Sequence, residues 1–156
     1  METIVRTASK DDVKEIARIH QEAFKEFFLT SLGEGFLKLY YSSLIDNEKS
    51  VVYCAVKDDK IVDSCSYSYV SRGFNSDLVK KNLCKYGLEA IRLLFIKPKT
   101  LVRLARNMNK ERKDTSIADD GRYAELYSIA VSPSCQGEGI GRLLLNMTET
   151  DIREHN

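Results

Sequence analysis

Hydrophobic positions follow two different periods in the N-terminal part of the chain. Residues 3–6 form a short run rich in β-branched side chains, which predicts a strand. From residue 13 to residue 27 hydrophobic side chains recur every three or four positions, which predicts a helix behind a cap made by Ser9 and Asp12. His20 falls on this hydrophobic stripe, where a histidine is more often packed in a core than catalytic.

A second helical pattern occupies residues 32–45, and strand patterns follow it. Residues 51–56 and 61–70 are separated by a polar turn, so the two segments are expected to pair as an antiparallel hairpin. The clearest strand pattern covers residues 123–131. Its alternation predicts a common face for four side chains, those of Glu125, Tyr127, Ile129 and Val131.

Between these strands the period changes again. Residues 72–113 carry hydrophobic side chains at helical spacing, which predicts two or three short helices, interrupted near Gly87 and stopped at Pro98. Residues 109–121 are polar and predict a loop that leads back to the sheet. Together they form a helical insertion at about residues 72–121. A last helix is predicted to begin at about residue 140.

Length and composition favour one globular domain over residues 1–156. Hydrophobic residues make up 43% and charged residues 30% of the chain, which is unlike a disordered protein. No hydrophobic run approaches the ~20 residues of a membrane span, and the N-terminus does not resemble a signal peptide. The four cysteines form no C-x-x-C pair, which predicts reduced thiols and a cytoplasmic protein. With two histidines, a metal site is not expected.

Charge is distributed unevenly along the chain. Residues 72–113 contain twelve Lys or Arg residues against three Asp or Glu residues, a local charge of +9 in a chain whose net charge is +1. The ordinary interpretation is a solvated helix face. The functional interpretation is attraction of the anionic part of a substrate. Nucleic acid is a weaker candidate partner, because the basic residues are spread over several helices with few aromatic residues between them.

A glycine-rich turn after the strand at 123–131 is the strongest chemical signal. It reads Q-x-x-G-x-G, with Gln136, Gly139 and Gly141. Glycines let backbone N–H groups turn toward a ligand, and the N-terminus of the following helix adds unpaired donors, so an anionic cofactor is expected at residues 137–142. The spacing excludes the dinucleotide fingerprint, and no G-K-[ST] closes a P-loop. A tight turn without ligand is the alternative.

This strand, turn and helix resemble the cofactor-binding segment of the GNAT superfamily of N-acetyltransferases. The resemblance implies an α/β fold with a mixed, mostly antiparallel sheet flanked by helices, and acetyl-CoA as the co-substrate. It implies that backbone groups of Ile129, Ala130 and Val131 bind the pantetheine arm. The pyrophosphate would be held by the turn and first helical residues, namely Gln136, Gly137, Glu138, Gly139, Ile140, Gly141 and Arg142.

The family order normally continues with another strand, a helix and usually two more strands, whereas this sequence stops at Asn156. Three alternatives follow: a truncated form of a longer acetyltransferase, a sheet completed by a second chain, or a CoA-binding module that is catalytically incomplete. The chain as given is predicted to be weakly active. Its strand at 123–131 is predicted to expose an edge through which a homodimer can form.

The reaction implied by the resemblance is acetyl transfer to a primary amine of a small molecule, such as an amino sugar. Glu125 is the only acid on the cofactor strand, so it is the candidate general base, and partial burial would raise its pKa. A solvent-facing carboxylate is the alternative. Tyr127 is the candidate acid for the CoA thiolate, although a strand tyrosine is more often part of the core. No metal and no membrane are expected to take part.

Overall fold

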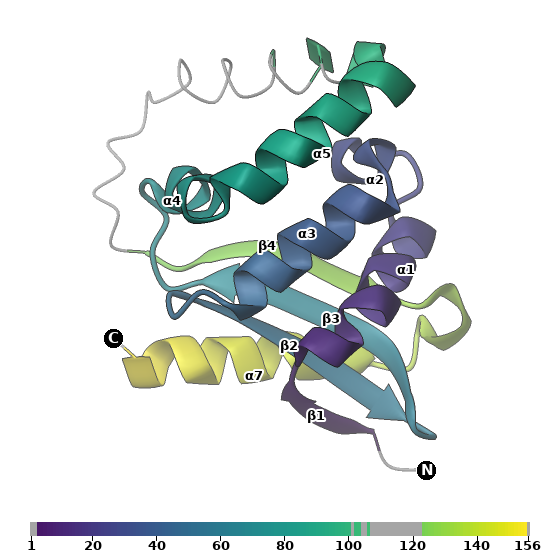
Figure 1. Ribbon diagram of the computed structural model, residues 1–156. Coiled ribbons are helices and arrows are strands. Elements are labelled where there is room, and N and C mark those ends of the chain that lie inside the picture. Colours follow the sequence, from purple (N-terminus) through teal and green to yellow (C-terminus); the bar gives the residue numbers. More distant parts are fainter. Residues whose placement is uncertain (1–2, 101, 104–105, 107–122, 156) are drawn as a thin grey trace.

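The computed structural model describes residues 3–100, 102–103, 106 and 123–155. Its centre is one antiparallel sheet in the order β1-β2-β3-β4. The strands are β1 (Ile4–Thr7), β2 (Ser50–Lys57), β3 (Lys60–Ser68) and β4 (Glu125–Val131). The mixed α/β class and the antiparallel sheet expected from sequence are therefore confirmed. Each strand pairs with the next one along the chain, and β4 forms one edge of the described sheet (Figure 1).

Helices cover both faces of the sheet. Helices α1 (Val13–Ala23) and α3 (Glu34–Ile45) pack on one face, and α7 (Ile140–His155) packs against β2, β3 and β4 on the other. Within residues 72–121, where the sequence predicts a helical insertion, lie α4 (Phe74–Lys81) and α5 (Leu83–Ile96). Helix α5 lies on the outer side of α3, away from the sheet (Figure 1). The result is an additional helical layer over the α1–α3 face. No described helix is both long and hydrophobic enough to cross a membrane.

The capping and turn signals are confirmed in the first half of the chain. The backbone N–H of Ser9 donates to Asp12 Oδ2 at 2.7 Å, which completes the predicted cap. A single-turn helix, η1 (Lys10–Asp12), precedes α1 there. The β2–β3 hairpin closes through Asp58 and Asp59, both with positive φ, as a two-residue turn of this hand requires.

Three boundaries differ from the expected ones. The first helix ends at Ala23 and not near residue 27, and a short helix, α2 (Phe28–Leu32), is split from α3 at Gly33, whose φ is +95°. The predicted interruption near Gly87 is wrong, because α5 runs through it. Gly87 is exposed, and no atom lies within 4 Å of a Cβ built on it. The only free-energy cost of glycine here is therefore its low helix propensity, which is not enough to interrupt α5. The predicted loop at 109–121 lies outside the described residues.

A β-bulge corrects the predicted face of β4. Ser66 pairs with Ser128 while Tyr67 pairs with Leu126, so Tyr127 is an extra residue without an opposite partner. The bulge places Tyr127 against Phe74 of α4, at 5.5 Å between ring centroids, whereas Ile129 packs on the α7 side. The four side chains predicted to share a face, those of Glu125, Tyr127, Ile129 and Val131, therefore do not all share one. An extra residue reverses the alternation, which a strict period of two cannot foresee.

Candidate functional site

The glycine-rich turn joins the end of β4 to α7 as the sequence predicts. A short turn of helix, η2 (Pro133–Cys135), leads into it, and α7 begins at Ile140. Gly137 and Gly139 have φ values of +86° and +80°, which non-glycine residues rarely adopt. No atom lies within 4 Å of a Cβ built on either glycine, so the backbone of the turn faces open space. The first N–H groups of α7 have no acceptor within the helix, and they lie at the end of α7 that the turn leads into.

An ion pair ties this turn to the tip of the hairpin. Lys57 Nζ donates to Glu138 Oε2 at 2.6 Å, and this hydrogen bond raises the pKa of Lys57. The lysine comes from the end of β2, 81 positions earlier in the chain. It places a cation beside the turn, where an anionic ligand would benefit from it. The sequence alone does not reveal Lys57, because only the fold brings it to the turn.

A buried carboxyl group lies beneath the first turn of α7. Asp63 is fully buried on β3 opposite Val131, and its Oδ2 lies 3.8 Å from the position of a Cβ on Gly141. Neither carboxyl oxygen has a hydrogen-bond partner among the described side chains and backbone. Burial raises the pKa of Asp63 to about 7, and the nearby backbone N–H of Ser64 acts in the opposite direction. The sequence pattern gives no sign of this residue either.

The other end of β4 carries the two candidate catalytic residues, side by side. Tyr127 Oη donates to Glu125 Oε2 at 3.3 Å and lies 2.8 Å from Ser68 Oγ. Burial raises the pKa of Tyr127 well above its ordinary value, and the negative charge of Glu125 acts in the same direction. Both side chains are half-buried. The pair can therefore exchange a proton or hold one between them, on the side of the sheet where α4 begins.

A second set of hydroxyl groups lies next to this pair, on the face of the sheet that α1 and α3 cover. Ser128 Oγ is 2.8 Å from Ser66 Oγ and 3.1 Å from Tyr41 Oη, which in turn lies 2.7 Å from His20 Nδ1. Burial lowers the pKa of His20 to about 4, so its imidazole is neutral at ordinary pH. The interpretation of His20 as a packed, hydrogen-bonded core residue is confirmed.

Strand β4 connects the two ends of this candidate site. Its seven residues span about 20 Å, at ~3.3 Å per residue. In the described part of the sheet, the edge of β4 away from β3 pairs with no other strand. That edge presents backbone donors and acceptors between the turn and Glu125. A long, thin, anionic ligand can lie along it with one end at the helix and the other near the carboxylate.

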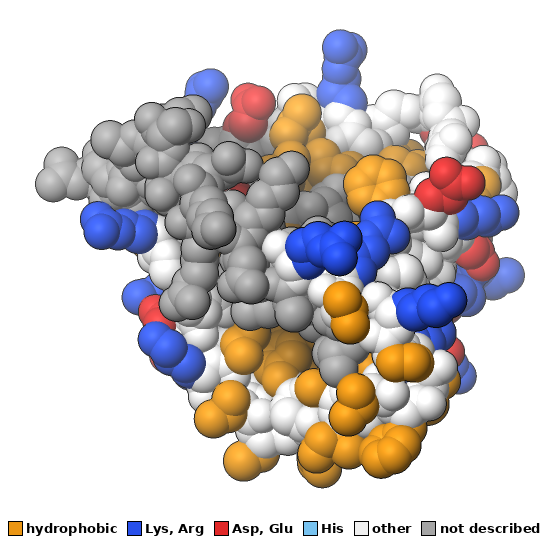
Figure 2. All heavy atoms as spheres, turned by 90° about the horizontal axis from the view of Figure 1, so that it is seen from above, with side chains coloured by type: hydrophobic (Ala, Val, Ile, Leu, Met, Phe, Trp, Pro, Cys, Tyr) orange, Lys and Arg blue, Asp and Glu red, His pale blue; other side chains and the backbone are white. Residues whose placement is uncertain are grey.

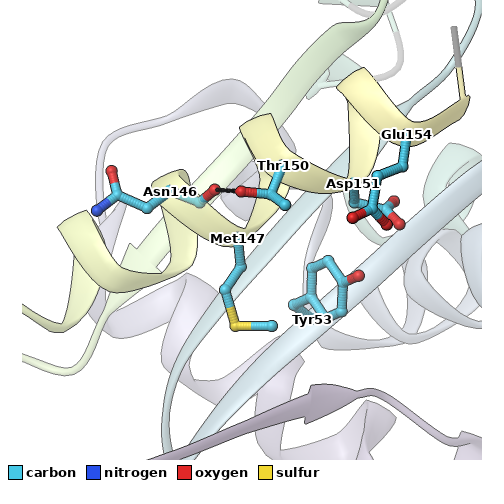
Figure 3. A pocket seen from close by; sticks show the side chains of 6 residues that line it. All are labelled: Tyr53, Asn146, Met147, Thr150, Asp151 and Glu154. Atoms are coloured by element: carbon cyan, nitrogen blue, oxygen red, sulfur yellow. Dashed lines mark hydrogen bonds between the residues drawn. The ribbon is translucent and has the colours of Figure 1, made fainter.

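A separate cavity lies away from this candidate site. It holds about 260 Å³ between Tyr53 of β2 and the second half of α7, and Thr150 donates to the backbone of Asn146 on its wall (Figure 3). Pockets for small organic ligands usually hold ~300 Å³ or more. The cavity contains none of the site residues expected from sequence. It therefore adds nothing to the site along β4.

Comparison with known proteins gives a family match over most of the chain. The family model described as the acetyltransferase (GNAT) family matches residues 13–156. A search of curated proteins finds no match.

Solved structures give likeness of fold at low identity. A GNAT family acetyltransferase from Brucella melitensis in complex with acetyl-CoA is 17% identical, with a TM-score of 0.56 over 99% of this chain and 71% of that one. An aminoglycoside antibiotic 6′-N-acetyltransferase from Acinetobacter baumannii is 10% identical, with a TM-score of 0.58 over 99% and 74%. A transcriptional regulator from Bacillus halodurans is 10% identical, with a TM-score of 0.55 over 99% and 76%. At these identities the likeness shows the fold and no particular substrate.

Proposed function

The chain belongs to the GNAT family of acetyltransferases, and from this we propose that it transfers the acetyl group of acetyl-CoA to a primary amine of a small molecule. The observation that carries the proposal is the open glycine turn at the N-terminus of α7, next to an unpaired edge of β4 in the described sheet. A diphosphate needs backbone donors without side chains in the way, and the turn supplies them.

In this proposal the diphosphate of CoA binds at residues 136–142. Gly137 and Gly139 supply the backbone approach, the first N–H groups of α7 and Arg142 supply donors, and Lys57 adds a cation near Glu138. The pantetheine arm then extends along β4, where Ile129, Ala130 and Val131 offer backbone hydrogen bonds. The length of β4 supports this arrangement, because it leads from the turn to Glu125.

The proposed chemistry uses the two residues at the start of β4. Glu125 removes a proton from the acceptor amine, whose nitrogen then attacks the thioester carbonyl. A backbone N–H of β4 stabilises the oxyanion, the C–S bond breaks, and Tyr127 supplies a proton to the departing thiolate. The 3.3 Å contact between Tyr127 and Glu125 supports this assignment, since it lets Glu125 reprotonate Tyr127 with the proton taken from the amine.

The proposed acceptor carries an anionic part, as in a phosphorylated or nucleotide-linked amino sugar. Support comes from the basic helical insertion. It begins beside the site, because Phe74 of α4 stacks on Tyr127. A basic segment beside the acceptor position would attract a phosphate of the substrate. Comparing turnover of phosphorylated and plain amino sugars tests this. A preference for polyamines would contradict it.

The first prediction concerns Gly139, because a side chain there would stand between the backbone and the diphosphate. The variant Gly139→Asp is expected to bind CoA at least about 100-fold more weakly in calorimetric titration, through the blocked approach and the added charge. Gly73→Asp is the matched control, since Gly73 also has a positive φ, of +75°, with open space around it, but lies at the start of α4. Equal CoA affinity in the two variants would contradict the proposed site.

The second prediction separates catalysis from binding at Glu125. The variant Glu125→Gln keeps the shape and a hydrogen-bonding oxygen for Tyr127 but cannot accept the amine proton. We expect kcat to fall about 100-fold, with the Kd for CoA unchanged. Unchanged kcat would remove Glu125 from the reaction. CoA binding with no turnover in the unsubstituted chain would indicate a binding module.

A further inference from the structure

Helix α5 is hydrophobic on two opposite sides. Tyr86 and Leu93 are buried against the rest of the protein. The opposite side carries an exposed stripe at spacings of four, three and four residues, formed by Cys84, Leu88, Ile91 and Phe95. Leu88 is 69% exposed and Phe95 is 82% exposed. A surface helix normally presents polar residues there, so a hydrophobic outer face indicates something that covers it.

Basic side chains lie at both ends of this stripe. Exposed lysines precede and begin α5, at Lys81 and Lys85, and Lys99 follows its end. Figure 2, which looks down on the side of the molecule where α5 lies, shows hydrophobic side chains gathered close to clusters of Lys and Arg. In the described part of residues 72–106 the only acids are Asp77 and Glu89, and Glu89 is paired with Arg92.

This distribution of charge argues against a second copy as the occupant. A two-fold contact between two α5 faces runs the helices either antiparallel or parallel. The first brings Lys85 toward the partner's Lys99 end, and the second brings Lys85 toward its own equivalent. Cations meet in both arrangements, and Asp77 is already within 3.8 Å of Lys80. Like charges brought together without acids between them oppose such a contact.

We propose that the outer face of α5 binds the surface of an anionic lipid bilayer. The hydrophobic stripe would enter the boundary between headgroups and acyl chains, and the lysines at its ends would lie among the lipid phosphates. The helix is about 21 Å long, so when α5 lies parallel to the surface, lysines near both of its ends can approach the lipid phosphates. This is a peripheral contact, and it departs from the expectation that no membrane takes part. It is independent of the acetyl-transfer reaction.

Vesicle sedimentation with the full chain tests the proposal. Vesicles of phosphatidylcholine alone are compared with vesicles that contain about a quarter phosphatidylglycerol, at about 0.1 M and about 1 M salt. We expect binding to the anionic vesicles at low salt, and loss of most of it at high salt. Replacing Lys81, Lys85 and Lys99 together by Gln is expected to weaken binding by about 100-fold, at about fivefold for each lysine.

The hydrophobic stripe is tested by the double variant Leu88→Gln and Phe95→Gln, which removes exposed side chains only and is expected to weaken vesicle binding at least about tenfold. The matched control is Ile4→Gln with Leu145→Gln, since both residues are exposed but lie on β1 and α7. Binding unaffected by the stripe variant, or absent in the unsubstituted chain, would overturn the proposal. A dimer in sedimentation velocity that only the stripe variant disperses would also overturn it, in favour of a contact between copies.

Discussion

Replacing Asp63 by Asn is expected to stabilise the protein at neutral and alkaline pH and to remove much of the pH dependence of its stability. Asp63 is fully buried without a hydrogen-bond partner in the described structure. Asn has nearly the same shape and no charge. The substitution therefore removes the cost of burying an ionised carboxylate and leaves the packing under α7 almost unchanged.

The direction of the effect follows from the raised pKa of Asp63. In the unfolded chain this carboxyl group ionises near pH 3.8, whereas burial raises its pKa to about 7 in the folded protein. Between these values the folded state binds a proton that the unfolded state lacks, so the contribution of Asp63 to stability is highest below about pH 4 and falls as pH rises through 7. The total loss from Asp63 is roughly 4 kcal/mol, and it is essentially complete about one pH unit above the folded pKa.

Urea unfolding near pH 5 and near pH 8 measures the difference. The gain of Asp63→Asn over the unsubstituted protein is expected to grow by about 3 kcal/mol from the lower to the higher pH. Groups elsewhere titrate equally in both proteins and cancel in the comparison. Asp59→Asn, in the exposed hairpin turn, is the matched control and is expected to show no such growth. A constant difference between Asp63→Asn and the unsubstituted protein would mean that Asp63 titrates normally.

The variant Gly141→Gln is expected to destabilise the protein by about 3 kcal/mol. A Cβ at this position would lie 3.3 Å from Val131 Cγ2 and 3.7 Å from Ile129 Cγ2, and a longer side chain has no room between α7 and the sheet. The first turn of α7 would have to move outward, so CoA affinity is expected to fall as well. Thermal and urea unfolding measure the loss of stability.

Gly87→Gln is the matched control, because it makes the same substitution in another helix. Gly87 has no atom within 4 Å of a Cβ position, so Gln there is expected to add about 0.5–1 kcal/mol of helix stability. The two variants should therefore shift the unfolding midpoint in opposite directions. Similar destabilisation in both would indicate that glycine matters for the helix backbone, and not for the approach of α7 to the sheet.

Local sequence was enough to predict most of the elements. The cap at Ser9, the hairpin turn after Lys57 and the glycine turn before Ile140 each depend on residues within a few positions of one another. Residue types at such short spacing restrict the backbone directly. For this reason the strand, turn and helix at residues 125–142 could be anticipated as one unit.

The remaining features depend on contacts between distant parts of the chain. Lys57 reaches the turn only because β2 ends beside it, 81 positions before Glu138. Asp63 reads as a polar residue in an alternating strand, and nothing nearby in sequence indicates that α7 covers it. The bulge at Tyr127 follows from how β3 and β4 pair, which a single strand does not reveal.

The order of the strands also bears on how the protein folds. The β2–β3 hairpin closes across two residues, Asp58 and Asp59, whereas β4 pairs with β3 only after residues 69–124 have been bridged. Each doubling of a closing loop adds ~0.6 kcal/mol of entropy cost, so the hairpin can form early and β4 joins late. The turn at residues 136–139 lies between β4 and α7, so it takes its final shape only when these two elements join the sheet. A chain that has collapsed around the hairpin alone therefore lacks the turn proposed to bind the diphosphate, and a ligand bound there would slow unfolding from this end of the sheet.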